Sequence, residues 1–326
     1  MRQQTKFLLV SFILSLPLWW GANILGKNIE EYFIFKELSK NPQIISAQLN
    51  FRELTSTPSP TPTPEIIESL KPEPTPTPEA KAMISVALTL DDESNVISQN
   101  IILKKAVNEK LPIASLTKLM TALVALENYD LLQPIIISYD ATSQDGDMGQ
   151  FKVGEIFLTK EILYSMLMES SNDAAYALSE AIGTEAFVNL MNLEANKLGL
   201  ENTHFSNPIG FDNRDNYSTV EDLVKLSTHL FQKPLILEVL STKEKNIYTS
   251  DGIIHHTAIN TNELLRETPE IVGGKTGYTA GAQGCLISIL KGQGNNNYFI
   301  NVVLGSVDRF GEMKEIIKRV NKDYTW

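Results

Sequence analysis

Apolar residues follow two different periods along the chain after residue 82. The segments AMISVALTLD (82–91) and NVISQNIILKKAV (95–107) are short, rich in strand-forming residues and bounded by polar residues, which predicts two strands. The apolar residues between Leu116 and Leu126 are instead spaced by three and four positions. That spacing places them on one face of a helix, and Pro112 is a typical start signal just ahead of it.

The middle of the chain is predicted to be helical, and its C-terminal part returns to strands. Helical patterns cover 159–170, 173–183, 184–199, 222–231 and, at the end, 309–320. Strand patterns cover 253–260, 271–279, 285–292 and 297–305. Ser218 and Glu221 are expected to form a capping box before the helix at 222–231. Strands at both ends with helices between them indicate an α/β (α+β) domain, in which the C-terminal strands complete one sheet and a helical subdomain is inserted.

The N-terminus predicts export from the cytoplasm. Residues 7–26 carry no charge, follow Arg2 and Lys6, and precede Glu30 and Glu31. Twenty uncharged residues are long enough to span a bilayer, and the positive flank favours a cytoplasmic N-terminus. We expect an uncleaved membrane anchor at residues 7–26, with a cleaved signal peptide as the alternative.

A proline-rich spacer follows the predicted anchor. Its 24 residues, TPSPTPTPEIIESLKPEPTPTPEA, hold eight of the 15 prolines of the chain. Such a segment cannot bury a core and favours extended polyproline II, so it is expected to act as a stalk. The predicted organisation is a cytoplasmic tip and anchor at 1–27, a stalk at 28–81 and one folded domain at 82–326, with a helical lobe at about 139–216.

Charge and composition exclude several functions. The net charge of −11 argues against a nucleic-acid-binding protein. The single cysteine, Cys285, lies in an apolar run and cannot form a disulfide within the chain, so it is expected in the core. The four histidines show no metal-ligand spacing, and neither a metal site nor a cofactor is predicted.

Ser115 and Lys118 form the first candidate catalytic pair. Residues three positions apart share a face of a helix, so the Ser115 hydroxyl and the Lys118 amine are within reach of each other. A buried lysine is costly unless it is paired or neutral, and a neutral lysine beside a serine is a base beside a nucleophile. A second S-x-x-K, Ser288 to Lys291, falls in a predicted strand, where an odd spacing sends the two side chains to opposite faces.

Two further triplets follow in the chain. Ser170, Ser171 and Asn172 stand at the break between two predicted helices, and Lys275, Thr276 and Gly277 lie in a predicted strand. Each triplet alone has a structural interpretation, since Asn172 can cap the next helix and Gly277 can serve a turn. In the order S-x-x-K, S-x-N and K-T-G, however, the three form the motif set of β-lactamases and penicillin-binding proteins.

From about residue 82 to residue 312 the chain resembles the serine D-alanyl-D-alanine carboxypeptidases, the low-molecular-weight penicillin-binding proteins of peptidase family S11. Segments such as PIASLTKLMTAL, LMESSNDAAYALSEAIG and VGGKTGYTAGAQGCL are similar to that family's. The resemblance implies a β-lactamase/transpeptidase-like fold: an antiparallel five-stranded sheet flanked by helices, plus an all-helical lobe. It further implies a penicillin-sensitive hydrolase of the bacterial cytoplasmic membrane, whose domain lies on the extracytoplasmic side and acts on peptidoglycan stem peptides.

The resemblance also implies roles for particular residues. Ser115 is the implied nucleophile and Lys118 its base, Ser170 relays a proton to the leaving D-alanine, and Asn172 holds the substrate amide. Lys275 and Thr276 are expected to bind the terminal carboxylate, and the amides of Ser115 and Tyr278 to form an oxyanion hole. Two positions depart from the family: Ser171 stands where glycine is common, and Tyr278 stands where histidine is common.

Several alternatives share parts of this motif set. A DD-endopeptidase uses the same machinery on cross-links. A class A β-lactamase would add a glutamate in an E-x-x-L-N segment, which is absent from this sequence. A Ser-His-Asp hydrolase is disfavoured because no G-x-S-x-G occurs. A tethered wall-binding protein without turnover is the non-enzymatic alternative, although no motif residue is missing.

Overall fold

The computed structural model describes residues 80–146 and 148–323. The predicted membrane anchor and nearly all of the predicted stalk lie outside these residues. Within the described part of the chain, none of the helices has the length and apolar character needed to cross a membrane.

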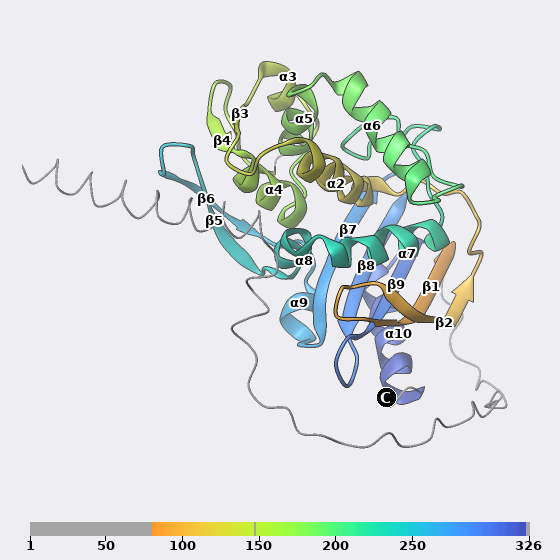
Figure 1. Cartoon of the computed structure of the whole chain (residues 1–326). Helices are drawn as coiled ribbons and strands as arrows, with labels where there is room; N and C mark the ends of the chain where they lie inside the picture. The colour runs from red at the N-terminus through yellow and green to blue at the C-terminus, as the bar shows by residue number, and fades with distance from the viewer. Residues whose placement is uncertain (1–79, 147, 324–326) are drawn as a thin grey trace, which may run out of the picture. The chain divides into compact units, whose positions relative to one another are not determined.

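A five-stranded antiparallel sheet forms the centre of the described part (Figure 1). Its strands stand in the order β2-β1-β9-β8-β7. Their bounds are β1 Ala82–Leu90, β2 Val96–Lys105, β7 Ile271–Thr279, β8 Gln283–Lys291 and β9 Asn297–Ser306. The first two strands of the domain therefore join the last three in one sheet, and the predicted fold class is confirmed.

Alternation along the strands buries both faces of the sheet. In β1, Ile84 and Val86 belong to the larger core cluster, whereas Met83 and Ala87 belong to the smaller one. Helix α10 (Arg309–Asp323) packs on the face with the smaller cluster and contributes Met313 and other side chains to it. The remaining helices, except α9, contribute to the larger cluster on the opposite face. Because successive side chains of a strand point to opposite faces, the sheet is the middle layer of three.

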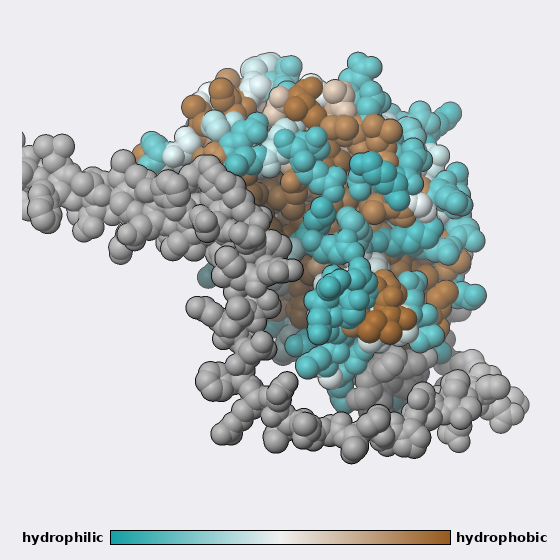
Figure 2. Space-filling view, in the orientation of Figure 1, coloured by the Kyte–Doolittle hydropathy of each residue, from teal (hydrophilic) through white to brown (hydrophobic). Residues whose placement is uncertain are grey.

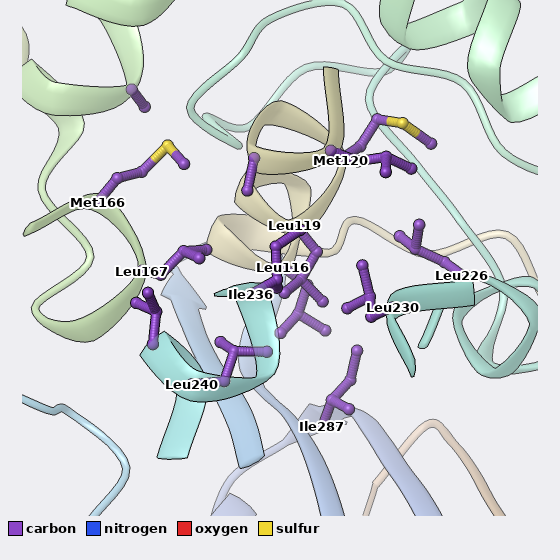
Figure 3. Close-up of a cluster of buried hydrophobic side chains, with 14 of the residues drawn as sticks. Leu116, Leu119, Met120, Met166, Leu167, Leu226, Leu230, Ile236, Leu240 and Ile287 are labelled. Carbon is purple, nitrogen blue, oxygen red and sulfur yellow. The ribbon is translucent and has the colours of Figure 1, made fainter. Parts of the chain in front are cut away.

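The helices of the larger layer follow one another along the middle of the chain. Their bounds are η3 Ala114–Thr117, α2 Lys118–Asn128, α3 Tyr139–Thr142, α4 Thr159–Met168, α5 Asn172–Glu180, α6 Thr184–Lys197, α7 Val220–His229, η4 Leu230–Gln232 and α8 Pro234–Ser241. A short helix, α9 (Leu264–Glu267), precedes β7. Figure 3 shows where this layer meets the sheet: Leu116 of η3 and Leu119 of α2 lie between side chains of α4 and α7, and Ile287 of β8 lies on the sheet side.

Two small two-stranded sheets are separate from the main sheet. β3 (Pro134–Ile136) pairs with β4 (Ile156–Leu158), and β5 (Glu244–Tyr248) pairs with β6 (Ile254–Ile259). The strand predicted at 253–260 therefore exists but belongs to a separate hairpin, not to the five-stranded sheet. One face of the folded unit, shown in Figure 2, carries hydrophilic and hydrophobic residues side by side.

The predicted capping box before α7 was wrong by one residue. The helix begins at Val220, and Thr219, not Ser218, accepts a hydrogen bond from the amide of Asp222. Ser218 is held instead by a backbone pairing with Leu111. That pairing leaves Thr219 as the last extended residue before the helix, which is the position a cap occupies.

Candidate active site

Ser115 and Lys118 meet at the junction of two helical elements. Ser115 lies in the 3-10 turn η3, and Lys118 is the first residue of α2. Side chains three positions apart eclipse one another in a 3-10 turn. Lys118 Nζ lies 3.0 Å from Ser115 Oγ. Ala114, directly before the serine, adopts a left-handed conformation with φ 48°, which costs about 1–3 kcal/mol in a residue other than glycine.

The Lys118 amine is fully buried, and three oxygens surround it. Besides Ser115 Oγ, these are Asn172 Oδ1 at 2.7 Å and the Ile209 carbonyl at 2.8 Å. Burial, assisted by repulsion from Lys275, holds the pKa of Lys118 well below its usual range. A neutral amine donates two hydrogen bonds and has one lone pair. Donation to Asn172 and Ile209 therefore leaves that lone pair for the Ser115 hydroxyl.

The segment around Ile209 supplies one of the oxygens that contact Lys118. Asn207 Oδ1 accepts hydrogen bonds from the amides of Ile209 at 3.2 Å and Gly210 at 2.7 Å, which fixes the carbonyl that faces Lys118. Gly210 has φ +99°, and a Cβ there would lie 2.0 Å from the Ala114 carbonyl oxygen. Only glycine fits such an approach. No role was predicted for this segment, although its Asn-Pro and Gly residues signal a turn.

The second triplet lies between α4 and α5. Ser171, not Asn172, caps α5 by accepting a hydrogen bond from the amide of Ala174 at 3.2 Å, so the interpretation of Asn172 as a cap was wrong. The Asn172 side chain is thereby available to accept from Lys118. Its Nδ2 donates to the Asp145 carbonyl at 2.5 Å, which fixes the orientation of the amide.

Ser170 stands in a strained backbone conformation next to a second lysine. Its φ is 66°, in the left-handed region. Lys275 Nζ lies 3.0 Å from Ser170 Oγ and 2.9 Å from the Thr276 carbonyl. Lys275 is 1% exposed, and burial together with repulsion from Arg309 lowers its pKa to about 7. The site therefore contains two Ser–Lys pairs.

The remaining residues of the third triplet lie along β7. Thr276 is buried, and its Oγ1 is 2.6 Å from Thr261 Oγ1. Gly277 passes close to Ser115, since a Cβ there would lie 3.0 Å from the Ser115 amide nitrogen. Tyr278 is 65% exposed at the end of the strand. The strand thus brings its backbone against the turn that carries Ser115.

Arg309 also belongs to this region, although no role was predicted for it. It begins α10, on the other side of the sheet, and its Nη1 donates to the Gly277 carbonyl at 2.9 Å. Its charge is one of the two causes that lower the pKa of Lys275. A lone arginine at the start of a helix far along the chain carries no local signal that would have revealed this contact.

One group of residues in the described part of the chain has metal-ligand chemistry, and none of the predicted site residues belongs to it. Glu127, Glu194 and His229 bring one ligand atom each within 4.8 Å of one another. Each carboxylate already forms an ion pair with a lysine: Lys233 lies 3.0 Å from Glu127, and Lys197 lies 2.8 Å from Glu194. The two Ser–Lys pairs contain hydroxyls, which can act as nucleophiles, and amines, which can accept protons.

Comparison with known sequences identifies relatives of the described domain. The family of D-alanyl-D-alanine carboxypeptidases, peptidase family S11, matches residues 75–308. The chain is 34% identical over 213 residues to D-alanyl-D-alanine carboxypeptidase DacF of Bacillus subtilis, which covers 63% of this chain and 54% of that protein. A D-alanyl-D-alanine endopeptidase of Pseudomonas aeruginosa is 36% identical over 183 residues, covering 54% of this chain and 58% of that protein. The chain thus spans little more than half the length of these two relatives.

Solved structures show the same fold. The Streptomyces K15 DD-transpeptidase aligns with a TM-score of 0.66 and 28% identity, covering 76% of this chain and 98% of that one. The D-alanyl-D-alanine carboxypeptidase of Mycobacterium tuberculosis H37Rv aligns with a TM-score of 0.64 and 26% identity, covering 73% and 87%.

Proposed function

The chain belongs to the D-alanyl-D-alanine carboxypeptidase family, peptidase family S11, and from this premise we propose that it is a serine-type carboxypeptidase that removes the terminal D-alanine of peptidoglycan stem peptides. One observation supports this proposal above the others. A buried lysine with a lowered pKa lies 3.0 Å from the hydroxyl of a partly exposed serine, and the amide of Asn172 lies on its other side.

Acylation begins at Ser115. Neutral Lys118 accepts the hydroxyl proton while Oγ attacks the carbonyl carbon of the penultimate D-alanine. The new C–O bond converts the carbonyl into a tetrahedral oxyanion. The amides of Ser115 and Tyr278 are the proposed donors to that oxyanion, and each such donor contributes a few kcal/mol to transition-state stabilisation.

The leaving group departs with a proton. Breaking the C–N bond releases D-alanine, whose nitrogen needs the proton that Ser115 gave up. We propose that Ser170 donates its hydroxyl proton to that nitrogen while Lys118, which holds the proton from Ser115, returns a proton to the Ser170 oxygen. Lys275 Nζ lies 3.0 Å from that oxygen and orients it. Water then attacks the acyl-enzyme, the ester C–O bond breaks, and the shortened peptide is released with Ser115 restored.

A free C-terminal carboxylate is the proposed recognition feature of the substrate. Two basic side chains adjoin β7, because Lys275 lies beside Ser170 and Arg309 donates to the Gly277 carbonyl, and Thr276 adds a hydroxyl on the same strand. The field of these basic side chains favours an anion at the end of a peptide. Tyr278 is the proposed contact with the stem peptide upstream of the D-alanines, which its exposure at the end of β7 supports.

Cleavage of cross-links is the second candidate. The Pseudomonas aeruginosa relative that is 36% identical is named an endopeptidase, and the same nucleophile and base serve both reactions. The two activities differ in the group on the leaving side of the scissile bond: a D-alanine with a free carboxylate in one case and a neighbouring stem peptide in the other.

We further propose that the domain works outside the bacterial cytoplasmic membrane, tethered by residues 7–26 and raised by the proline-rich stalk. The uncharged run, its positive flank and the extended spacer support this arrangement, as does the extracytoplasmic position of peptidoglycan. Protease treatment of intact spheroplasts tests it: the domain is expected to be digested, and its protection would contradict the proposal.

The activity is tested with the purified full chain, a fluorescent penicillin and Ser115→Ala as the matched control. A long-lived penicillin adduct is expected on the wild type and not on Ser115→Ala. In a second assay, the wild type alone is expected to release D-alanine from a pentapeptide stem. Faster cleavage of a cross-linked muropeptide would favour the endopeptidase. Rapid penicillin hydrolysis without an adduct would indicate a β-lactamase, and neither adduct nor hydrolysis in folded protein would indicate a wall-binding protein without turnover.

A further inference from the structure

A hydrogen-bonded series of two carboxylates and two histidines, the histidine chain, ends at the residue next to Ser170. His256 Nε2 lies 2.8 Å from Glu169 Oε1, and His255 Nδ1 lies 2.7 Å from His256 Nδ1. At the far end, His255 Nε2 lies 3.2 Å from Glu155 Oε2. Glu169 is the residue that follows α4 and precedes Ser170. None of these four residues has a role in the mechanism above.

A β-bulge explains how two consecutive histidines join one chain. In the pairing of β5 with β6, Ile247 faces His256 and Tyr248 faces Ile254, which leaves His255 as the extra residue. Neighbouring residues of a regular strand point to opposite faces, whereas a bulge turns one side chain toward the other. The His255 ring stacks on Phe151, with 5.6 Å between ring centroids and 10° between planes, and this contact fixes its orientation.

Hydrogen counting gives the chain a direction. Glu169 Oε1 already accepts a hydrogen bond from Ser165 Oγ at 2.5 Å, so His256 must direct an N–H at it from Nε2. A neutral His256 then presents Nδ1 as an acceptor, to which His255 donates. Because the contact of His255 Nε2 with Glu155 Oε2 also needs an N–H, the two rings together carry one proton more than two neutral imidazoles. While that proton lies on His255, it fixes the tautomer of His256, in the way that a carboxylate orients the base of a catalytic triad.

The anchored Glu169 lies next to a strained residue. Ser170 has φ 66°, a conformation that persists only when its surroundings enforce it. Ser165 contacts both neighbours of Ser170, because its Oγ donates to Glu169 and its carbonyl accepts from the Ser171 amide at 3.4 Å. Ser171 is itself held as the cap of α5. Glu169 is the only one of these two neighbours that the histidine chain holds.

We propose that Glu169 and His256 are positioning residues for Ser170. They hold the end of α4 so that Ser170 keeps its left-handed conformation and directs its hydroxyl at Lys275. The inference rests on the proposed function, since Ser170 is the proton relay there. Glu155 and His255 contribute through the tautomer of His256 and lie farther from the reacting atoms.

The test compares two carboxylates at opposite ends of the same chain. Full-length wild type, Glu169→Ala, Glu169→Gln and Glu155→Ala are mixed with a fluorescent penicillin, and the acylation rate at saturation, the half-saturating concentration and the final labelled fraction are measured. Glu169→Ala is expected to lower the saturating rate roughly tenfold or more, because small misplacements of a catalytic group have large effects on rate. The half-saturating concentration should stay within about twofold, because Ser170 acts in proton transfer and not in ground-state binding.

The other variants distinguish a role of Glu169 in positioning Ser170 from a general loss of folding. Glu169→Gln keeps an oxygen for both Ser165 and His256 and should recover most of the rate, and Glu155→Ala should remain within about threefold of the wild type. A destabilised fold would instead lower the final labelled fraction. If Glu169→Ala does not fold, His256→Leu replaces it, because this variant removes one of the two hydrogen-bond partners of Glu169 Oε1. It should lower the saturating rate as well, but by a smaller factor.

Three results would overturn the proposal: an unchanged saturating rate in Glu169→Ala or, where that variant does not fold, in His256→Leu; a Glu169→Gln rate as low as that of Glu169→Ala; or an equal loss in Glu155→Ala. Absence of labelling in the wild type is a different outcome, because it contradicts the proposed function itself.

Discussion

Gly277 lies so close to Ser115 that a methyl group on its α-carbon would stand 3.0 Å from the Ser115 amide nitrogen and 3.1 Å from the Ala114 Cβ. The third motif therefore approaches the first closely along the backbone of β7. A side chain at this position forces the strand and the turn apart.

We predict that Gly277→Ala lowers the rate of acylation by a penicillin roughly tenfold while the protein stays folded, because its Cβ would meet the turn that carries Ser115 at 3.0–3.1 Å and displace it. Stopped-flow labelling and a thermal melt measure the two quantities. Gly273→Ala in the same strand is the matched control, since its Cβ would meet Leu240 at an ordinary 3.5 Å. Equal effects of the two substitutions would contradict the prediction.

Removal of the Lys118 amine is expected to lower acylation by about 10²–10⁴-fold, the usual contribution of a general base. Lys118→Met tests this, because methionine fills much of the same volume without a charge. In the wild type, burial and Lys275 lower the pKa of Lys118, so the rate should rise with pH and level off well below pH 10.5. A Lys118→Met rate near that of the wild type would exclude Lys118 as the base.

Lys275 is expected to lower the stability of the fold at neutral pH. Its pKa is about 7 in the folded state against an ordinary 10.5, because burial disfavours the charged form. Below pH 7 both states are protonated and the folded protein bears the full burial cost. Between pH 7 and 10.5 the unfolded chain binds a proton that the folded chain does not. The contribution of Lys275 to the free energy of unfolding therefore becomes less unfavourable as the pH rises.

Lys275→Met should accordingly be more stable than the wild type at pH 7, by on the order of 1–3 kcal/mol once its lost hydrogen bonds are subtracted, and nearly inactive. Urea unfolding of both proteins at several pH values measures the difference, which should shrink toward pH 10. A difference that is constant with pH would show that the protonation of Lys275 does not carry the effect.

Cys285 should be inert to thiol reagents in the native state. The residue is fully buried in β8, and burial raises the pKa of its thiol to about 12, whereas only the thiolate reacts. Incubation with iodoacetamide followed by intact mass is expected to show no adduct in native protein and one adduct after denaturation. Rapid native labelling would indicate that the strand opens locally.

The fold was largely predictable because most of its strands have strong periodic patterns. The segments predicted at 82–91, 271–279 and 297–305 correspond to β1, β7 and β9 of the sheet. The hairpin partner β5 was missed because only Ile247 of its five residues is buried, which leaves no apolar alternation to detect. Helix α8 was missed because its run PLILEVLS is short and almost uniformly apolar, a pattern that suits a buried strand equally well.

The site was predictable as far as side chains carry motifs. Ser115, Lys118, Ser170, Asn172 and Lys275 come together in the structure, whereas their catalytic roles stay predictions. The Ile209 carbonyl was not foreseeable, because every residue has such an oxygen and only the fold selects one. Likewise Arg309 and Glu169 contribute through contacts across the sheet and along the histidine chain, which no spacing in the sequence encodes.

The pairing of β1 with β9 has a consequence for how the protein folds. The Ala80 amide donates to Glu312, 232 residues away, and β1 is paired along its length with both β2 and the second-last element of the chain. Loop closure over such a separation slows folding, and no sheet can be completed until β9 has left the ribosome. The helices between them are local structures that form earlier. We therefore expect that folding of the domain ends with insertion of β9, and that a chain truncated before β9 exposes an unpaired strand and aggregates.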